Sequence, residues 1–274
     1  MQTGVKRKRQ AHLLVCLLFL TVYISGILQA CGRKQPELFV CFFACSEDAD
    51  SILLKTEDAA VLIDTGDAAD EEALLEKLHA AGVTSLNLLI LTHPDKDHIG
   101  GACAVLSEFP VEQVIETSCE KGSRIQEELD RALLEEKVSV PRDTQTFSYG
   151  ELTLTIYPPK EASYKNANNY SIAVLAQYEG KSFFFAGDAK KKRIRELLDE
   201  KLPQADVYKV AYHGRDLKEG KELIERLKPS YAVVTAKQAE EGTEKALLEA
   251  GSEILSTYGE DVVFTVKEGI LDVE

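Results

Sequence analysis

A segment of eleven residues, 91–101, constrains this chain more than any other part of its sequence. It reads Leu-Thr-His-Pro-Asp-Lys-Asp-His-Ile-Gly-Gly, between an apolar run at 86–91 that predicts a buried strand and a second apolar run that predicts a helix. This tight turn concentrates four potential metal ligands: His93, Asp95, Asp97 and His98. Imidazole and carboxylate groups at this density suit one or two divalent cations. An ordinary acidic turn is the alternative, but the chain has only five histidines and two of them lie here.

Three other predicted strands end in residues of the same chemistry. One apolar run leads into Asp64, a second into Asp188 and a third into His213. The carboxyl ends of strands in layered α/β proteins meet at one rim, where such proteins hold their catalytic groups. We therefore expect these three side chains to join the turn at 91–101.

Taken in this order, the motifs resemble those of the metallo-β-lactamase-fold hydrolases over residues 38–274. The His-x-Asp-x-Asp-His pattern is similar to the ComEC-like branch, the lactamase-like domain of competence proteins. The resemblance implies an α/β fold, the αββα sandwich, in which helices cover the outer faces of two packed sheets. Because no linker or low-complexity tract interrupts the chain, residues 37–274 are expected to form a single domain.

The sequence pattern predicts alternating strands and helices that suit this fold. The expected helices are 70–81, 125–134, 190–202, 217–227 and 243–250. The expected strands are 38–45, 51–55, 61–63, 86–91, 111–115, two within 146–157, then 172–178, 182–186, 207–211, 231–235, one near 254 and 262–266.

The resemblance also implies two metal positions that share a bridging carboxylate. The first would be held by His93, Asp95 and a third ligand, Asn168 or Ser171. The second would be held by Asp97, His98 and His213, with Asp188 as the bridge. The typical zinc enzymes have histidine at the last two positions of the first set, whereas the ComEC-like branch has an Asn-x-Ser element there.

Catalytic roles follow for three residues. A metal-bound water has a lowered pKa, and Asp97 is placed to orient it or to take its proton. Asp64 would lie behind the turn and orient a ligand. Arg215, on the loop after His213, would bind phosphate. The basic run 190–193 could do the same, although residues 190–192 alternatively form a solvated helix face. The expected cofactor is one or two divalent ions, zinc or manganese, and an oxygen-rich site favours manganese.

The N-terminus predicts an export signal. A basic segment at 6–9 precedes an uncharged apolar run at 13–27, which is short for a membrane span. Leu-Gln-Ala-Cys at 28–31 resembles a lipobox, so residues 1–30 would be removed, Cys31 would carry lipid and residues 31–36 would form a short tether. The domain would then be exported and anchored on the extracytoplasmic face of the cell membrane. An uncleaved signal anchor is the alternative.

Charge and cysteine usage limit the partners. Residues 1–30 hold four basic residues and no acid, so their removal changes the net charge from −14 to −18. Such a surface argues against nucleic acid as a partner, because binding to nucleic acid depends on basic contacts. The chain has no Cys-x-x-Cys pair, which argues against a cysteine zinc site. The four cysteines of the domain, Cys41, Cys45, Cys103 and Cys119, are expected to be small buried residues.

The favoured function is therefore a metal-dependent hydrolase that acts on a small molecule or on phosphodiester or related ester bonds. A lipid-anchored scaffold that is inactive or binds metal weakly is the main alternative, because the loop at 46–50 lacks the glycines of the competence-type pattern. A β-lactamase and a DNA-uptake accessory are weaker alternatives. The sequence leaves the oligomeric state open.

Overall fold

Strand pairing divides the residues that the computed structural model describes, 37–46 and 48–274, into two sheets. These residues belong to one compact unit, Glu37–Glu274. The expected signal peptide 1–30, the lipidation site Cys31 and the tether 31–36 lie outside the described residues. Among the described helices, none has both the length and the apolar character needed to cross a membrane.

The first sheet has eight strands in the order β15-β14-β1-β2-β3-β4-β5-β6. They are β1 (Glu37–Phe42), β2 (Ile52–Lys55), β3 (Ala60–Ile63), β4 (Leu88–Ile90), β5 (Val114–Ile115), β6 (Val138–Ser139), β14 (Val262–Lys267) and β15 (Ile270–Val273). The second sheet has seven strands in the order β13-β12-β11-β10-β9-β8-β7. They are β7 (Gln145–Tyr149), β8 (Leu152–Tyr157), β9 (Ala173–Tyr178), β10 (Lys181–Phe185), β11 (Val207–Lys209), β12 (Tyr231–Val234) and β13 (Glu253–Ser256).

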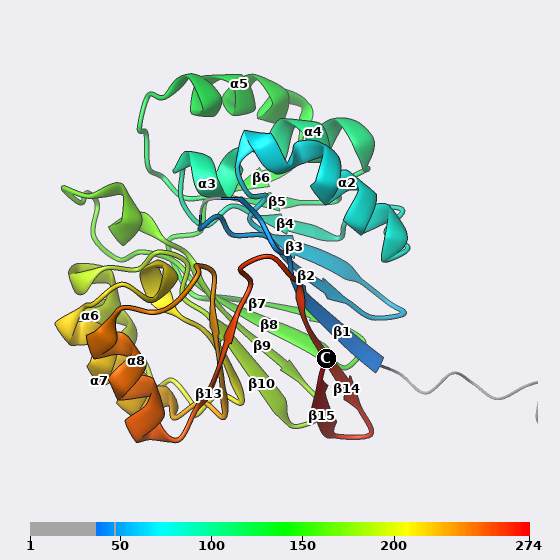
Figure 1. Ribbon diagram of the computed structural model, residues 1–274. Coiled ribbons are helices and arrows are strands. Elements are labelled where there is room, and N and C mark those ends of the chain that lie inside the picture. Colours follow the sequence, from blue (N-terminus) through cyan, green and yellow to red (C-terminus); the bar gives the residue numbers. More distant parts are fainter. Residues whose placement is uncertain (1–36, 47) are drawn as a thin grey trace, which may run out of the picture. The chain divides into compact units, whose positions relative to one another are not determined.

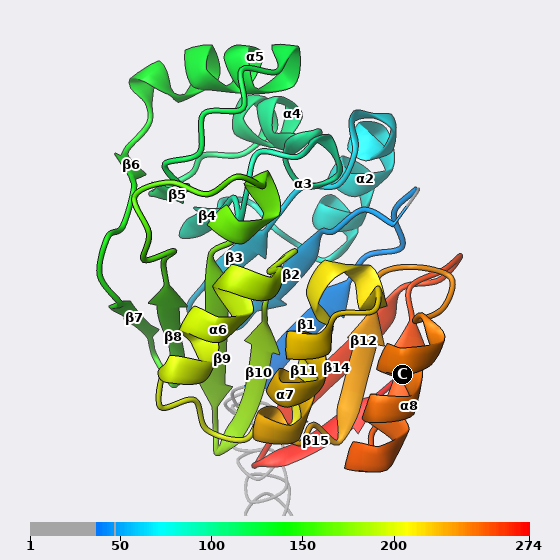
Figure 2. The ribbon, with the colours of Figure 1, turned by 90° about the vertical axis from the view of Figure 1, so that its left-hand side faces the viewer.

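Helices cover the outer face of each sheet (Figures 1 and 2). Beside the first sheet lie α2 (Glu71–Ala80), α3 (Lys96–Ile99), α4 (Ala102–Glu108) and α5 (Arg124–Ala132). Beside the second lie α6 (Lys191–Asp199), α7 (Lys218–Leu227) and α8 (Glu241–Ala250). Short 3-10 turns, η1 (Ala68–Asp70), η2 (Leu133–Glu135), η3 (Ala167–Tyr170) and η4 (Ala211–Gly214), connect these elements.

Alternation along the strands builds three apolar layers. Successive side chains of a strand point to opposite faces of the sheet. In β10, Phe183 and Phe185 join the layer between the two sheets, whereas Phe184 joins the layer under α6 and α7. In β1, Val40 lies between the sheets and Cys41 under the helices of the first sheet. Helix, sheet, sheet and helix therefore follow one another, which confirms the expected αββα fold.

The parallel strands bring the polar residues of the chain to one rim. β3, β4, β5 and β6 run parallel in the first sheet, as do β10, β11, β12 and β13 in the second. Asp64 directly follows β3, and the turn that carries His93 follows β4. Asp188 follows β10 and His213 follows β11. The carboxyl ends of these four strands therefore supply one site.

Several expected boundaries were wrong. β1 ends at Phe42, so Cys45 lies beyond the strand, and both Cys45 and Cys103 are half-buried although they were expected to be buried. The strand expected over 111–115 pairs only at β5 and at one isolated bridge, Leu86 to Val111. The helix expected over 190–202 ends at Asp199. The two edge strands of the first sheet, β6 and β15, were missed because they are only two and four residues long.

Candidate metal centre

The turn after β4 has its shape because two glycines follow it. A Cβ on Gly100 would lie 2.3 Å from the backbone nitrogen of Ala68, and a Cβ on Gly101 would lie 2.6 Å from the carbonyl oxygen of Thr65. No side chain fits at such distances. The missing side chains allow the segment after β3 to lie directly against α3, which carries His98.

Asp64 holds this turn from behind. Its Oδ1 accepts a hydrogen bond from the backbone N–H of Thr92 (2.7 Å), and its Oδ2 accepts one from the Thr92 hydroxyl (2.7 Å). Oδ2 also lies 2.7 Å from Nδ1 of His98. Asp64 has a φ of 58°, a left-handed conformation that non-glycine residues rarely adopt. Its carboxylate fixes the His98 ring so that Nε2 points away from it, the arrangement that orients a histidine ligand.

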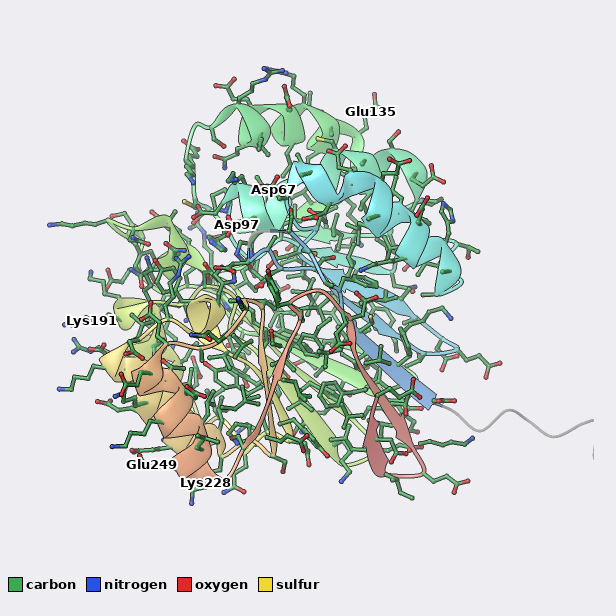
Figure 3. All side chains as sticks on the ribbon, in the orientation of Figure 1. Asp67, Asp97, Glu135, Lys191, Lys228 and Glu249 are labelled. Atoms are coloured by element: carbon green, nitrogen blue, oxygen red, sulfur yellow. The ribbon has the colours of Figure 1, made fainter. Side chains whose placement is uncertain are left out.

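Four side chains converge on one point at the rim: Asp97, His98, Asp188 and His213. Each offers one potential ligand atom, and these atoms all lie within 4.8 Å of one another. Nε2 of His98 lies 3.4 Å from Oδ1 of Asp188, and Nε2 of His213 lies 3.5 Å from Oδ2 of Asp97. Asp97 lies where the loops of the two sheets meet (Figure 3).

The atoms of this cluster lack the partners that buried polar atoms need. In the described part of the chain, Nε2 of His98, Nε2 of His213 and Oδ1 of Asp188 are buried without a well-formed hydrogen bond. The nearest groups are other ligand candidates, since Nε2 of His213 lies 3.0 Å from Oδ2 of Asp188. Burial of such groups without a partner is costly. Two imidazole nitrogens and two carboxylates at these distances suit a divalent cation, which would satisfy all of them. The residues therefore fit the metal that the sequence predicts.

The set expected to hold a first metal is less complete. Nε2 of His93 lies 3.8 Å from Oδ2 of Asp95 and 4.0 Å from Oδ2 of Asp188. Burial, with the nearby His98, holds the pKa of His93 well below its usual range, so its ring is neutral as a metal ligand requires. Asp95, however, already pairs with Lys121, whose Nζ lies 2.9 Å from Oδ1 of Asp95.

The two residues proposed as third ligand have different contacts. The amide nitrogen of Asn168 donates to Oδ2 of Asp188 (3.1 Å) and lies 3.5 Å from Nε2 of His93, so this side chain belongs to the site. A rotation of its amide by 180° would present the oxygen instead. The hydroxyl of Ser171 donates to the carbonyl of Asn168 (2.7 Å) and accepts from the N–H of Asp188 (3.1 Å). Ser171 thus holds the backbone on both sides, and Asn168 is the better placed of the two.

Sequence reasoning missed two residues at this rim, Asp50 and Lys209. Lys209, at the end of β11, is 1% exposed and forms an ion pair with Asp50, which is also 1% exposed. Its Nζ lies 3.6 Å from Oδ1 of Asp188 and donates to the carbonyl of Gly187. Asp50 lies 3.4 Å from Nδ1 of His213. The signal was present, because Lys209 interrupts an apolar strand four residues before His213, and a buried lysine needs an acid as partner.

The basic run 190–193 separates into distinct roles. Lys191 and Lys192 pair with acids on the surface, at 3.8 Å from Glu219 and 2.7 Å from Glu161 respectively. Arg193, by contrast, is fully buried. Its guanidinium donates to the carbonyls of Ser171 (2.8 Å) and Tyr157 (2.6 Å), so it supports the loop that carries Asn168.

Arg215 lies on the rim loop after η4, where the sequence placed it. Its guanidinium contacts the Tyr212 ring, at 4.6 Å from the centroid, and lies 3.6 Å from Oδ2 of Asp48. The Arg215 side chain is 44% exposed, so it is accessible to a ligand.

Comparison with known proteins agrees with this geometry. A family model for the metallo-beta-lactamase superfamily matches residues 47–236. ComE operon protein 3 of Bacillus subtilis is 29% identical over 170 residues, which are 61% of this chain and 22% of that protein. Recombination protein 2 of Haemophilus influenzae is 25% identical over 189 residues, which are 67% of this chain and 22% of that protein. The chain thus spans about a fifth of the length of these relatives.

Solved structures show the same architecture. The metallo-beta-lactamase fold protein YhfI from Bacillus subtilis matches with a TM-score of 0.56 and 13% identity, over 88% of this chain and 100% of that chain. Igni18, a metallo hydrolase from the archaeon Ignicoccus hospitalis, matches with a TM-score of 0.55 and 15% identity, over 84% of this chain and 100% of that chain. Identities this low concern the fold alone. With the family model covering more than half of its residues, this chain belongs to the metallo-beta-lactamase superfamily.

Proposed function

We propose that this chain is a metal-dependent hydrolase of phosphodiester or related ester bonds. The observation that carries the proposal is the convergence of buried, unsatisfied atoms of His98, His213 and Asp188 beside the carboxylate of Asp97. One or two divalent ions, Mn²⁺ or Zn²⁺, would supply Lewis acidity and lower the pKa of water there. Because two carboxylates contribute, the donor set is harder than an all-histidine site, and this favours Mn²⁺.

The side chains of the site differ in solvent exposure, and this difference indicates a role for each. Asp97 is 28% exposed, whereas His98 and Asp188 are at most 3% exposed. Asp97 is therefore the carboxylate that can meet a water molecule, orient it and accept its proton. The carboxylate of Asp64 hydrogen-bonds Thr92 and His98 and so keeps the His98 ring in place, which makes Asp64 a positioning residue. Arg215 offers a planar guanidinium that binds two phosphate oxygens at once.

The test is hydrolysis of bis(p-nitrophenyl) phosphate by the purified chain with added Mn²⁺ or Zn²⁺. EDTA should stop turnover, and Asp97→Asn should nearly abolish it, because that variant removes both a ligand charge and the proton acceptor. Nitrocefin and a simple ester run in parallel separate a β-lactamase and an esterase from a phosphodiesterase. Turnover that survives both EDTA and Asp97→Asn would refute the metal mechanism.

One observation favours a second function, a scaffold that is inactive or binds metal weakly. Oδ1 of Asp95 already pairs with Lys121, and Asn168 directs its amide nitrogen at the ligands, so two donors of the first metal position have other partners. Absence of turnover with either metal, together with weak metal binding, would support this reading. A DNA-uptake accessory rests only on the competence names of the relatives, and the net charge of −14 opposes contact with nucleic acid.

The proposed location is the extracytoplasmic face of the cell membrane. Residues 1–30 would be removed as a signal peptide, Cys31 would carry lipid, and residues 31–36 would tether the domain 37–274. The lipid, rather than the acidic surface, would hold the protein at an anionic bilayer. Its substrate would then be a small molecule or a phosphodiester that is accessible outside the cytoplasm.

A further inference from the structure

Three side chains at the rim of the metal centre form one stacked group: Lys190, Tyr212 and Arg215. Nζ of Lys190 lies 3.8 Å from the centroid of the Tyr212 ring, and Cζ of Arg215 lies 4.6 Å from the same centroid. Cations at these distances are attracted by the electrons of the ring. One tyrosine therefore holds two positive charges in place.

The backbone brings this group to the metal ligands. Lys190 follows Asp188 by two residues, Tyr212 directly precedes His213, and Arg215 follows it by two. Tyr212 (φ 52°, ψ 45°) and His213 (φ 53°, ψ 24°) both adopt the left-handed conformation. Two such residues in succession are strained, and strain of this kind is concentrated at functional sites. The turn leaves the His213 ring buried and the Tyr212 ring half-buried at the rim.

The neighbours of Lys190 have different partners. Lys191 and Lys192 form ion pairs with Glu219 and Glu161, and Lys191 points outward from α6 (Figure 3). The first turn of α6 carries no acidic residue, although the N-terminus of a helix favours acids and disfavours lysine. The helix dipole therefore does not account for Lys190, which directly precedes α6.

We infer that Lys190, Tyr212 and Arg215 form a subsite that binds a phosphate group of the substrate beside the metal centre. The inference rests on the proposed function and names the anion that the site recognises. In a chain with a net charge of −14, two adjacent cations give an anion a local point of approach. The acid that now pairs with Arg215, Asp48, is 40% exposed at 3.6 Å, and an anion can replace such a solvated partner.

The test is calorimetric titration of inorganic phosphate into the metal-free protein at low ionic strength, so that the ligand cannot bind through a metal. Lys190→Gln and Arg215→Gln should each raise the Kd roughly three- to tenfold, as expected for loss of one charged contact. Lys191→Gln and Lys192→Gln are matched controls, because they remove the same charge one and two positions after Lys190, and each should change the Kd less than about twofold.

Two variants of Tyr212 test the stacking itself. Tyr212→Leu removes no charge but deprives both cations of their ring, so it should weaken phosphate binding severalfold. Tyr212→Phe keeps the ring but removes the hydroxyl beside Lys190 and Arg215, so it should weaken phosphate binding less than Tyr212→Leu does. If the leucine variant does not fold, as judged by circular dichroism, the comparison of Lys190→Gln with Lys191→Gln decides alone.

Two results would overturn the inference. The first is no phosphate binding at about 20 mM, near the weak limit of such contacts. The second is an equal loss of phosphate affinity in all four single-charge variants, which would indicate only long-range attraction. The proposed function fails separately. Phosphate binding that depends on Lys190 and Tyr212, without any phosphodiester turnover, supports the subsite and refutes the hydrolase. Phosphodiester turnover, together with phosphate binding that is unchanged in the Lys190 and Tyr212 variants, supports the hydrolase and refutes the subsite.

Discussion

The ammonium of Lys209 lies between the carboxylates of Asp50 and Asp188, in contact with the first and 3.6 Å from the second. Asp50 comes from the loop before β2, Asp188 from the end of β10 and Lys209 from β11, so this cation joins loops of both sheets. A lysine at 1% exposure is stable only when its charge is paired. Lys209 is therefore a fixed internal cation that holds the acids of the rim together.

Lys209→Met is expected to destabilise the metal-free protein by about 3–5 kcal/mol, because it leaves buried carboxylates without their cation. Urea unfolding in EDTA measures the change. Lys201→Met, at an exposed position, is the matched control and should alter the free energy of unfolding by less than about 0.5 kcal/mol. The double variant Asp50→Asn/Lys209→Met should recover part of the loss, since it removes both charges. Equal stability of the two lysine variants would show that the ion pair contributes nothing.

Metal content should depend more on His213 than on Asn168. His213 belongs to the four-residue cluster, whereas Asn168 belongs to the less complete set around His93. His213→Ala should therefore remove most of the tightly bound metal, and Asn168→Ala should leave one ion per chain. Mutation of a residue that only supports a ligand lowers metal affinity about 10–100-fold, and loss of the ligand itself costs more. Elemental analysis after dialysis measures both. Wild-type metal content in both variants would contradict the ligand assignment.

Much of the rim was predictable because its residues end strands. The turn at 91–101 and the acids and histidine at Asp64, Asp188 and His213 follow apolar runs, and strand ends of a layered α/β fold meet at one rim. The structure brings Asp97, His98, Asp188 and His213 within 4.8 Å, as these patterns indicate. All four rim strands, β3, β4, β10 and β11, were expected from their apolar residues, although β11 also contains Lys209.

Other features depend on contacts that no local pattern encodes. Asp50 and Lys209 are separated by more than 150 positions in the chain, and only the packing of two sheets makes them partners. Lys190 and Arg193 stand three apart in one basic run, yet one stacks on Tyr212 and the other is buried. Local composition gives the same signal for both, because it records charge and not the surface against which each side chain packs.

Export and lipid anchoring give a prediction that does not depend on the metal. If the lipobox at 28–31 is used, Cys31→Ser should abolish labelling by a fatty-acid analogue and either release the domain from the membrane fraction or leave the precursor uncleaved. Metabolic labelling and fractionation measure these outcomes. Cys103→Ser, within the domain, is the control and should be labelled like the wild type. Unchanged labelling and processing in Cys31→Ser would refute the anchor.

The titration of His213 couples metal binding to pH. Burial disfavours the charged ring, but the carboxylates of Asp188 and Asp50 outweigh this effect and raise the pKa of His213 to about 10 in the metal-free protein. Asp188, with Asp64 and Asp50, likewise raises the pKa of the buried His98 well above its usual range. Both rings are therefore protonated near neutral pH, and both must lose that proton to act as ligands.

Stability and metal affinity should consequently change in opposite directions with pH. A raised pKa means that the stabilising contribution of His213 is fully present below its unfolded pKa of 6.5 and is lost as the pH rises through about 10. The metal-free protein should thus become less stable over this window. Over the same window, affinity for Zn²⁺ or Mn²⁺ should rise about tenfold per pH unit for each proton displaced.

Competition with a chromophoric chelator, corrected for the chelator's own protonation, measures the affinity between pH 6.5 and 9. Calorimetry in two buffers of different ionisation enthalpy counts the protons released. Asn168→Ala should keep the wild-type slope, because an amide does not titrate. His213→Gln should lower the slope by about one proton, because it removes one of the two titrating ligands. A metal affinity that stays constant across this range would show that neither ring carries the proton, and the paired acids would then have to be neutralised by Lys209 alone.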